Sequence, residues 1–242
     1  MTYHGVWRDF EGVRSNIKTT TYYSKKLLVS QEHDAQRVSD IFFNGGRLNC
    51  GTRQDFFWSN IPKYAKGKSL NVLDVGSGVR PIAVYGNQSK IYNLSFSLND
   101  TVEILPLLEK YFKPLGFQLQ PNLLDLNDTY DCIYFGSSLQ YFENWREVLS
   151  ETTKACKGLV IISDTPFGEI DTFACAQVNT YPIIIPRWIF SRMEITSFFM
   201  RQGFSLVHEE LMPGVSRFSN YPQDYASIHH TGYVFSRNKL HM

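Results

Sequence analysis

A glycine-rich turn follows an apolar segment that begins at Leu70, and its residue types suit the binding of a nucleoside. The turn reads Asp74-Val75-Gly76-Ser77-Gly78. Glycine has no Cβ atom, so the main chain of such a turn, placed at the carboxyl end of a strand, can come close to a nucleoside-bearing cofactor. A turn without any ligand is the alternative. We predict that the turn contacts a cofactor through Asp74, Gly76, Ser77 and Gly78.

The spacing of the glycines indicates which cofactor this is. A dinucleotide-binding fingerprint carries a third glycine three positions after the second, and Pro81 stands there instead. A pyrophosphate site is therefore disfavoured. An acid just before two glycines is similar to the first motif of S-adenosylmethionine (SAM)-dependent methyltransferases, in which the glycines pass under the amino-acid half of SAM and the acid lies near its ammonium group.

A second segment, Tyr130–Phe142, reads as a buried strand that ends in small polar residues. Small residues at the edge of a parallel sheet leave room for a ligand. We predict that Ser137, Ser138, Leu139 and Gln140 contact the cofactor and that Tyr141 contacts the methyl acceptor.

Methyl transfer is a displacement at carbon, so the protein mainly supplies alignment and removal of water. A hydroxyl acceptor would gain about 10²–10⁴-fold from a general base, whereas an acceptor that is already anionic needs none. The base candidates are Asp164, His229 and His230, with Tyr181 as an orienting hydroxyl. The alternatives are that Asp164 caps a turn before Pro166 and that the two histidines form a solvated strand entrance.

Arg187 and Arg217 are candidates for contact with an acidic group on the acceptor. A guanidinium can hold a phosphate or a carboxylate, so an anionic acceptor is one expectation, and a surface charge or a loop salt bridge is the other. The four cysteines form no C-x-x-C pair, and neither a zinc site nor a disulfide framework is indicated. We predict no bound metal.

From Leu70 onward, short apolar segments alternate with helix signals, which is the pattern of a parallel α/β sheet. The fold class is therefore α/β. Capping patterns at Asp100, Asn144 and Ser191 predict three helix starts. The predicted strands are Asn71–Val75, Ile91–Leu98, Asn122–Leu124, Cys132–Phe135, Leu159–Ser163, Phe204–Glu209 and Gly232–Ser236.

Residues 1–66 precede this pattern, and we predict a helical N-terminal extension or cap there, with the cofactor-binding domain over residues 67–242. Two long segments, 165–190 and 211–231, should emerge at the edge of the glycine turn and cover the acceptor. The N-terminal helix has Ser30 as its predicted N-cap, Ala35, Val38, Ile41 and Phe42 as its buried stripe, and Gly45-Gly46 as its end.

Composition favours a globular protein with a small-molecule partner. Of the 242 residues, 43% are hydrophobic and 15% aromatic, which excludes a disordered chain. A net charge of +1 without a basic run indicates no positively charged surface that would bind nucleic acid or an anionic membrane. We expect no signal peptide and no membrane insertion, since no apolar run approaches ~18 residues. Free thiols in the cytoplasm are expected, and the sequence does not indicate an oligomeric state.

Seven short blocks carry a resemblance to known proteins: Gly5-Val6-Trp7, Val72-Leu73-Asp74, Ser137–Tyr141, Asp164–Phe167, Tyr181-Pro182, Trp188–Phe190 and Gly203-Phe204. Their order resembles class I SAM-dependent methyltransferases, and more closely a family often encoded with bacterial surface-polysaccharide genes. The resemblance implies a Rossmann-like, seven-stranded, mostly parallel sheet whose last strand is antiparallel. It also implies SAM as cofactor, S-adenosylhomocysteine (SAH) as product, and a small oxygen nucleophile as acceptor, such as a sugar, a sugar phosphate or a related precursor of capsule or lipopolysaccharide.

One part of the family pattern is missing. Class I enzymes hold the ribose hydroxyls with an acid at the end of the second strand, about 20 residues beyond the glycines. Phe96–Asn99 occupy that place, and we interpret the following Asp100 as a helix N-cap. The candidates are therefore Ser97 or Asn99 for the ribose and Asn122 or Asp125 for the adenine.

Two other functions fit parts of the pattern. A non-catalytic SAM-binding subunit is consistent with the missing ribose acid and with the lack of an obvious base. An NAD-type nucleotide-sugar oxidoreductase would share the fold class, although Pro81 argues against it.

Overall fold

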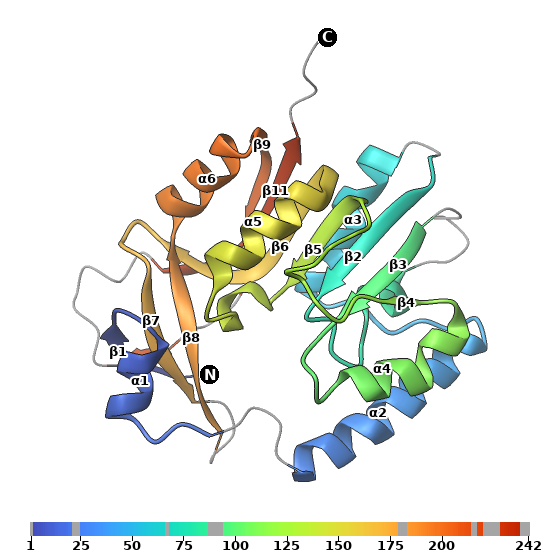
Figure 1. The fold of residues 1–242 in the computed structure, drawn as a ribbon, viewed down its shortest axis with the longest axis horizontal. Coiled ribbons are helices and arrows are strands. Elements are labelled where there is room, and N and C mark those ends of the chain that lie inside the picture. The colour runs from blue at the N-terminus through green and yellow to red at the C-terminus, as the bar shows by residue number, and fades with distance from the viewer. Residues whose placement is uncertain are drawn as a thin grey trace.

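The computed structural model describes residues 2–20, 25–65, 68–86, 94–178, 183–213, 217–219 and 228–237. In this part of the chain, eleven strands join edge to edge and six α-helices pack against them (Figure 1). None of the helices in these ranges has both the length and the apolar character needed to cross a membrane.

Seven of the strands form the sheet that the sequence predicts. Their order is β4 (Gln118–Leu119), β3 (Leu94–Asn99), β2 (Leu70–Val75), β5 (Tyr130–Gly136), β6 (Cys156–Gly168), β11 (His229–Arg237) and β9 (Phe204–Leu211). The first five run parallel to one another, and β11 runs antiparallel to both β6 and β9. The Rossmann-like class, with its last strand antiparallel, is confirmed.

Helices cover both faces of this sheet. Successive side chains of each strand point to opposite faces, so both faces carry apolar side chains that the helices bury. In β2, for example, Leu73 and Val75 join one buried cluster and Val72 joins the other. The first cluster also contains apolar side chains of α1 (Phe10–Asn16), α5 (Trp145–Ala155) and α6 (Arg192–Arg201). The second contains those of α2 (Lys25–Phe43), α3 (Thr52–Ala65) and α4 (Leu105–Tyr111).

A second, smaller sheet continues from the carboxyl end of β6. There, Phe167 and Gly168 pair with β8 (Ile184–Ser191). The smaller sheet then runs from β8 to β7 (Phe173–Val178) and β1 (Thr2–Trp7), which Figure 1 labels, and ends with β10 (Arg217–Ser219). It places residues from the two ends of the chain beside the edge where the parallel strands finish.

The capping patterns at Asn144 and Ser191 predict their helices correctly. α5 begins at Trp145, which is buried. At α6, the Ser191 hydroxyl accepts a hydrogen bond from the Glu194 amide at 3.3 Å. Gly203, at φ +79°, follows the end of α6 in the left-handed conformation that favours glycine.

Two local predictions between β3 and β5 are wrong. Asp100 is not a helix N-cap, because α4 begins only at Leu105 and Pro106 occupies its first turn. Asn122–Leu124 is a turn, and the strand of this region is β4. The Asn122 side chain accepts a hydrogen bond from the Leu124 amide at 3.0 Å, which closes the turn locally in place of a strand ladder.

The N-terminal residues differ from the prediction in two respects. α2 begins at Lys25, so Ser30 lies inside the helix and does not cap it. β1 is a strand that no local pattern predicts. The stripe of α2 is otherwise close to the expected one: Ala35 and Val38 are buried, Ile41 and Phe42 are half-buried, and the helix ends before Gly45-Gly46.

The segment 165–190 is not the long loop that the sequence analysis expects. The end of β6 and the strands β7 and β8 occupy most of it. In the segment 211–231, the structure describes β10 and the adjoining ends of β9 and β11, while residues 214–216 and 220–227 lie outside the described residues. A covering role for this second segment stays a prediction.

Candidate functional site

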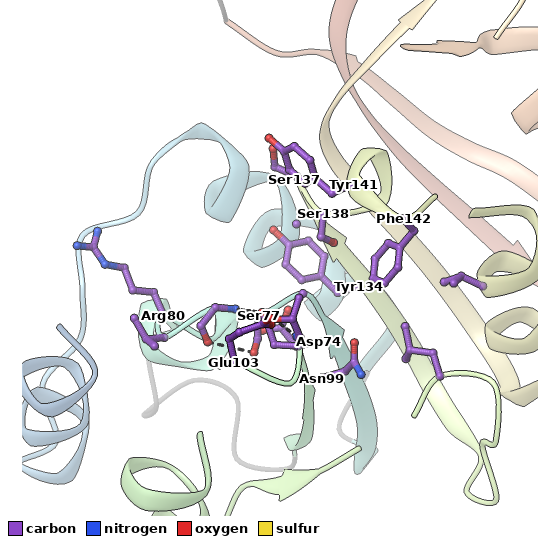
Figure 2. Close-up of a pocket in the computed structure, with 18 of the residues that line it drawn as sticks. Asp74, Ser77, Arg80, Asn99, Glu103, Tyr134, Ser137, Ser138, Tyr141 and Phe142 are labelled. Atoms are coloured by element: carbon purple, nitrogen blue, oxygen red, sulfur yellow. Dashed lines mark hydrogen bonds between the residues drawn. The ribbon is translucent and has the colours of Figure 1, made fainter. Parts of the chain in front are cut away.

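A cavity of about 850 Å³ opens at the carboxyl ends of β2, β3 and β5 (Figure 2). Small-molecule sites span roughly 300–1,000 Å³, so this cavity can take a cofactor together with a small acceptor. Eight of the residues predicted from sequence line it: Asp74, Gly76, Ser77, Gly78, Asn99, Ser137, Ser138 and Tyr141.

The glycine turn forms one wall of the cavity. Gly76 and Gly78 have φ angles of +69° and +58°, a conformation that glycine adopts readily and other residues do not. A Cβ at Gly76 would lie 2.5 Å from the Ser138 Cβ, whereas a Cβ at Gly78 would meet no heavy atom within 4 Å. Gly76 therefore lets the segment after β5 pack on the turn, and Gly78 leaves open space on it.

Asp74 is buried beneath the turn, where its Oδ2 accepts a hydrogen bond from the Ile82 amide at 2.7 Å. Burial raises the pKa of Asp74 to about 7, although this hydrogen bond and the positive charge of Arg53 oppose the rise. A carboxyl group that ionises near neutral pH at the wall of a cavity is suited to a cationic ligand.

Arg53 of α3 also lines the cavity, and the sequence analysis missed it. Its Nη1 donates to the Gly136 carbonyl at 3.3 Å, at the end of β5. Two other cavity arginines each have a carboxylate partner, Glu143 for Arg14 and Asp34 for Arg80. Among the described residues, no carboxylate forms an ion pair with Arg53. No motif marks this arginine, because a single arginine in the first turn of a helix has no spacing to recognise.

Ser97 and Asn99 are buried at the end of β3, where a ribose-binding acid was expected. The Ser97 hydroxyl is directed to the Gln118 side chain, at 3.4 Å, and does not line the cavity. Asn99 does line it, and its Nδ2 donates to the Gln120 carbonyl at 2.8 Å. Both side chains therefore bind the β4 region.

Two carboxylates follow β3 in the cavity wall. The Asp100 carboxylate accepts one hydrogen bond from the Gly78 amide at 2.7 Å and another from the Thr101 amide at 2.8 Å. Glu103 is exposed and lines the cavity, as Ser77 of the glycine turn does, and Figure 2 labels both. Asp100 thus stabilises the turn, whereas the Glu103 carboxylate has no hydrogen bond or ion pair with the described residues.

Neither adenine candidate lines the cavity. Asn122 and Asp125 belong to the turn after β4, and the cavity wall there consists of Pro121, Leu123 and Leu124. This end of the cavity is therefore apolar.

The segment after β5 supplies another part of the wall. Ser137 has a left-handed φ of +59°, and the Ser138 hydroxyl donates to the Val75 carbonyl at 2.5 Å. Leu139 and Gln140 are fully buried behind them and do not line the cavity. The Gln140 amide donates to the Ser137 carbonyl at 2.8 Å, so it holds the strained serine in place.

A mixed wall of apolar and charged side chains belongs to the smaller sheet and α1. It contains Phe10 and Arg14 of α1, Ile185 and Pro186 of β8, and Phe142, which follows the segment after β5. This wall extends beyond the glycine turn and is available to a second ligand.

The structure brings two of the base candidates together. His230 Nδ1 lies 2.6 Å from Asp164 Oδ1, and Asp164 has a left-handed φ of +53°. Burial of Asp164 acts to raise its pKa, but the hydrogen bond and charge of His230 and the charges of Arg53 and Arg187 outweigh it and lower the pKa below its usual value.

The other two catalytic candidates are His229 and Tyr181. His229 is exposed on β11, and Tyr181 lies outside the described residues. Neither Asp164 nor His230 lines the cavity. His230 Nε2 is buried and has no hydrogen-bond partner.

Arg187 of β8 is buried, with 1% of its surface exposed, and does not line the cavity. Its Nη1 donates to the Tyr3 hydroxyl and to Gln177 Oε1, both at 2.7 Å. Its Nε and Nη2 have no hydrogen-bond partner within the described ranges. The backbone of Arg217 lies in β10, at the opposite edge of the smaller sheet, and the description does not include its side chain.

No protein-family model matches the chain, and no curated protein matches it. Solved structures share its fold. The 1,6-didemethyltoxoflavin-N1-methyltransferase of Burkholderia thailandensis, bound to 1,6-didemethyltoxoflavin and SAH, is 16% identical, with 88% of this chain and 87% of that chain covered and a TM-score of 0.52. Magnesium protoporphyrin IX methyltransferase of Synechocystis, bound to SAH, is 15% identical, with 85% and 100% covered and a TM-score of 0.53.

A third structure is the N-terminal domain of EvdMO1 in the presence of SAH and D-fucose. It is 10% identical, with 80% of this chain and 86% of that chain covered and a TM-score of 0.54. At these identities the likeness shows the fold. The chain has the Rossmann-like fold of SAM-dependent methyltransferases.

Proposed function

We propose that this protein is a SAM-dependent methyltransferase acting on an oxygen atom of a small acceptor. The observation that carries the proposal is the cavity at the glycine turn. It lies at the carboxyl edge of the parallel strands, where sheets of this type bind their ligands, and its size suits two small molecules. Bound SAM would supply an activated methyl carbon there.

The charges of the cavity fit the amino-acid part of SAM, which carries an ammonium and a carboxylate. Asp74 and Arg53 both line the cavity and have opposite charges. We assign the ammonium to Asp74 and the carboxylate to Arg53, since charge-assisted hydrogen bonds are the stronger kind. The apolar wall at Leu123 and Leu124 suits the adenine.

The chain after the glycine turn supports SAM over a dinucleotide. A dinucleotide fingerprint directs its pyrophosphate to the N-terminus of an α-helix. Here, Pro81 precedes a four-residue 3₁₀-helix, Ile82–Tyr85, whose Ile82 amide is already bonded to Asp74. The described residues after the turn therefore offer no such helix, and an NAD-type oxidoreductase is disfavoured.

Glu103 takes the place of the missing ribose acid in this proposal. It lines the cavity, no described residue binds its carboxylate, and a carboxylate can accept hydrogen bonds from both hydroxyls of a ribose.

Glu103→Gln is expected to weaken SAH binding by about tenfold, since hydrogen bonds to charged groups are stronger than those to neutral groups. Calorimetry with SAH and with its 2′,3′-dideoxy analogue measures this, because the analogue should bind both proteins equally. Glu143→Gln is the matched control, since Glu143 lines the same cavity but is paired with Arg14. Equal losses for SAH and the dideoxy analogue would contradict the assignment.

The acceptor we propose is a sugar, a sugar phosphate or a related precursor of a bacterial surface glycan. The motif order described above supports it. The wall of Phe10, Arg14 and Phe142 offers both rings and charge for such a molecule. We place the reaction in the cytoplasm, consistent with four cysteines that are all free thiols.

Calorimetric titration with SAM and SAH tests the proposed function. We expect one site for each ligand, with no heat from NAD⁺ under the same conditions. Failure of both SAM and SAH to bind would overturn the proposal.

A non-catalytic SAM-binding subunit is the second candidate. It is favoured by one observation: among the described residues, neither Asp164 nor His230 lines the cavity. Bound SAM that yields no SAH with any member of a panel of sugars, sugar acids and sugar phosphates would favour this candidate over the enzyme.

A further inference from the structure

Buried polar atoms without a partner gather around Asp164. Such atoms are rare in folded proteins, and each needs an explanation. Among the described residues, four buried side-chain nitrogens have no hydrogen-bond partner: Trp145 Nε1, Arg187 Nε, Arg187 Nη2 and His230 Nε2. Three of the four belong to Arg187 and His230, and both of these side chains interact with Asp164.

We propose that Arg187 and His230 form the acceptor end of the site, and that the acceptor carries a carboxylate or phosphate, held by Arg187, together with a hydroxyl that meets His230. The proposal rests on the proposed function and names its substrate class.

The free atoms of Arg187 have the geometry of an oxyanion site. Nε and Nη2 lie on one edge of the guanidinium plane, so their N–H bonds point the same way and match two oxygens of one acid. Nη1 is held on the other side by the Tyr3 hydroxyl and Gln177 Oε1. The guanidinium is thus fixed, with one whole edge unused.

No acid in the described part of the chain fills this edge. Among the described residues, no carboxylate lies within 4 Å of the Arg187 guanidinium, although the side chain is buried. Asp164, the nearby acid, is bonded to His230. Asp164 acts on Arg187 through its charge and not through a hydrogen bond, so the buried Nε and Nη2 donors stay unpaired and a bound anion would be favoured here.

His230 offers the complementary group. Asp164 Oδ1 lies against Nδ1, so the neutral form of this imidazole would carry its proton on Nδ1 and would leave the Nε2 lone pair free for the acceptor. A hydroxyl of the acceptor can donate to that lone pair. As the new carbon–oxygen bond forms and the bond between the methyl carbon and sulfur breaks, the hydroxyl proton passes to Nε2, with SAH as the leaving group. Asp164 is then a positioning residue.

The site adjoins the cavity at Tyr141. The Tyr141 ring lines the cavity, and its centroid lies 5.7 Å from the Arg187 guanidinium carbon. The Tyr141 hydroxyl donates to Gln177 Oε1 at 3.0 Å, the same oxygen that binds Arg187. Tyr141 therefore contacts both the cavity and the surroundings of the Arg187 guanidinium, and in this proposal an acceptor that displaces its ring reaches Arg187 from the cavity.

Asp164 and Arg187 also occupy equivalent positions on neighbouring strands. β6 and β8 pair in parallel at Phe167 and Phe190, and Asp164 and Arg187 each lie three residues before that pair. Asp164 has a left-handed φ of +53°. Strain of this kind is common at ligand sites.

Anion binding to the SAH-loaded protein tests the proposal. The probes are inorganic phosphate, D-glucuronate and, as the uncharged counterpart, D-glucose, each titrated by calorimetry. We expect phosphate or glucuronate to bind, and the probe that binds identifies the acid. Arg187→Gln and Arg187→Lys should each weaken that binding by at least about tenfold, because lysine keeps the charge but lacks the two-pronged edge.

Arg192→Gln is the matched control, since Arg192 does not line the cavity and is already paired with Glu169 and Glu209. Anion affinity should change by less than about twofold in this variant. Histidine side-chain ¹⁵N spectra of the wild type test the other proposed contact, between the acceptor hydroxyl and His230 Nε2. The His230 resonances should show a proton on Nδ1 and a shift of Nε2 when glucuronate binds.

Three results would overturn the proposal: no binding of either anion, glucose binding as tightly as glucuronate, or unchanged anion affinity in both Arg187 variants. SAH affinity is measured for every variant and reports whether the cofactor site is intact. A wild type that binds the anions but not SAH would refute the proposed function and leave the anion site standing. If Arg187→Gln fails to fold, the titrations of Arg187→Lys and of the wild type still decide whether the anion site exists.

Discussion

Gly76→Ala is expected to destabilise the protein by about 3 kcal/mol and to weaken SAH binding more than about 100-fold. Two physical effects add. A non-glycine residue in the left-handed region costs about 1–2 kcal/mol, and Gly76 has φ +69°. The new Cβ would also lie 2.5 Å from the Ser138 Cβ, and forced overpacking costs about 1–3 kcal/mol.

The binding loss follows from the same contact. Ser138 cannot move away freely, because its hydroxyl is bonded to the Val75 carbonyl, one residue before Gly76. The clash would separate the glycine turn from the segment after β5, and both line the cavity. A displacement of about 1 Å in a binding site can cost 10²-fold.

Gly78→Ala is the control for this prediction. Gly78 has φ +58°, so it shares the backbone strain, but a Cβ there meets no heavy atom within 4 Å. We expect a loss of about 1–2 kcal/mol from strain alone. Urea denaturation of both variants gives the comparison, and a Gly76→Ala loss no larger than that of Gly78→Ala would show that the Ser138 contact is unimportant.

Local patterns predicted the central sheet because their physical causes are local. The apolar strand before Asp74 and the two glycines after it are neighbours in sequence, and so are Ser191 and the amide of Glu194 that it caps. The structure confirms the strand, the turn and the helix start at these places.

Asp100 shows why other local patterns fail. It precedes a glutamate by three residues, as a capping box requires, yet its carboxylate binds the Gly78 amide, 22 residues earlier in the chain. A pattern of neighbouring residues cannot predict a hydrogen-bond partner that is this far away in the chain. The same limit explains Arg53 and Glu103, whose importance comes from cavity walls built by distant segments.

The smaller sheet was missed for a related reason. β1 pairs with β7 and β10, which come from the middle and the end of the chain, so its pairing is wholly long-range. The segment 165–190 was interpreted as a loop because such segments often cover ligands, although Phe173–Val178 has apolar residues typical of a buried strand. The sequence also named Asp164 and His230 separately, and only the antiparallel pairing of β11 with β6 brings them together.

Asp74 is expected to make the stability of the ligand-free protein fall as pH rises from about 4 to 7. Burial raises its pKa from 3.8 to about 7 in the folded protein. Between these pH values the unfolded chain has released a proton that the folded protein still holds. The free energy of unfolding therefore falls with each unit of pH. One pKa unit corresponds to about 1.4 kcal/mol, and the whole effect is on the order of 4 kcal/mol.

Asp74→Asn should remove this slope, because asparagine stays neutral at every pH while its carbonyl can still accept from the Ile82 amide. Urea denaturation from pH 4 to 8 measures it, with Glu143→Gln as a control that changes an exposed carboxylate of the same cavity. If wild type and Asp74→Asn have the same pH profile, Asp74 is ionised throughout the range and its burial has been misjudged.

Ligand binding should make Asp74 favour its ionised form, whereas burial alone favours the protonated form. The ammonium group of SAH favours the ionised carboxylate, so binding below pH 7 must expel the proton that burial retains. Affinity should therefore rise by up to about tenfold per pH unit below pH 7 and level off above it. Calorimetry at pH 6 in two buffers of different ionisation enthalpy counts the proton directly. Release of about one proton by the wild type and none by Asp74→Asn would place the ammonium at Asp74, whereas no release by either would place it elsewhere.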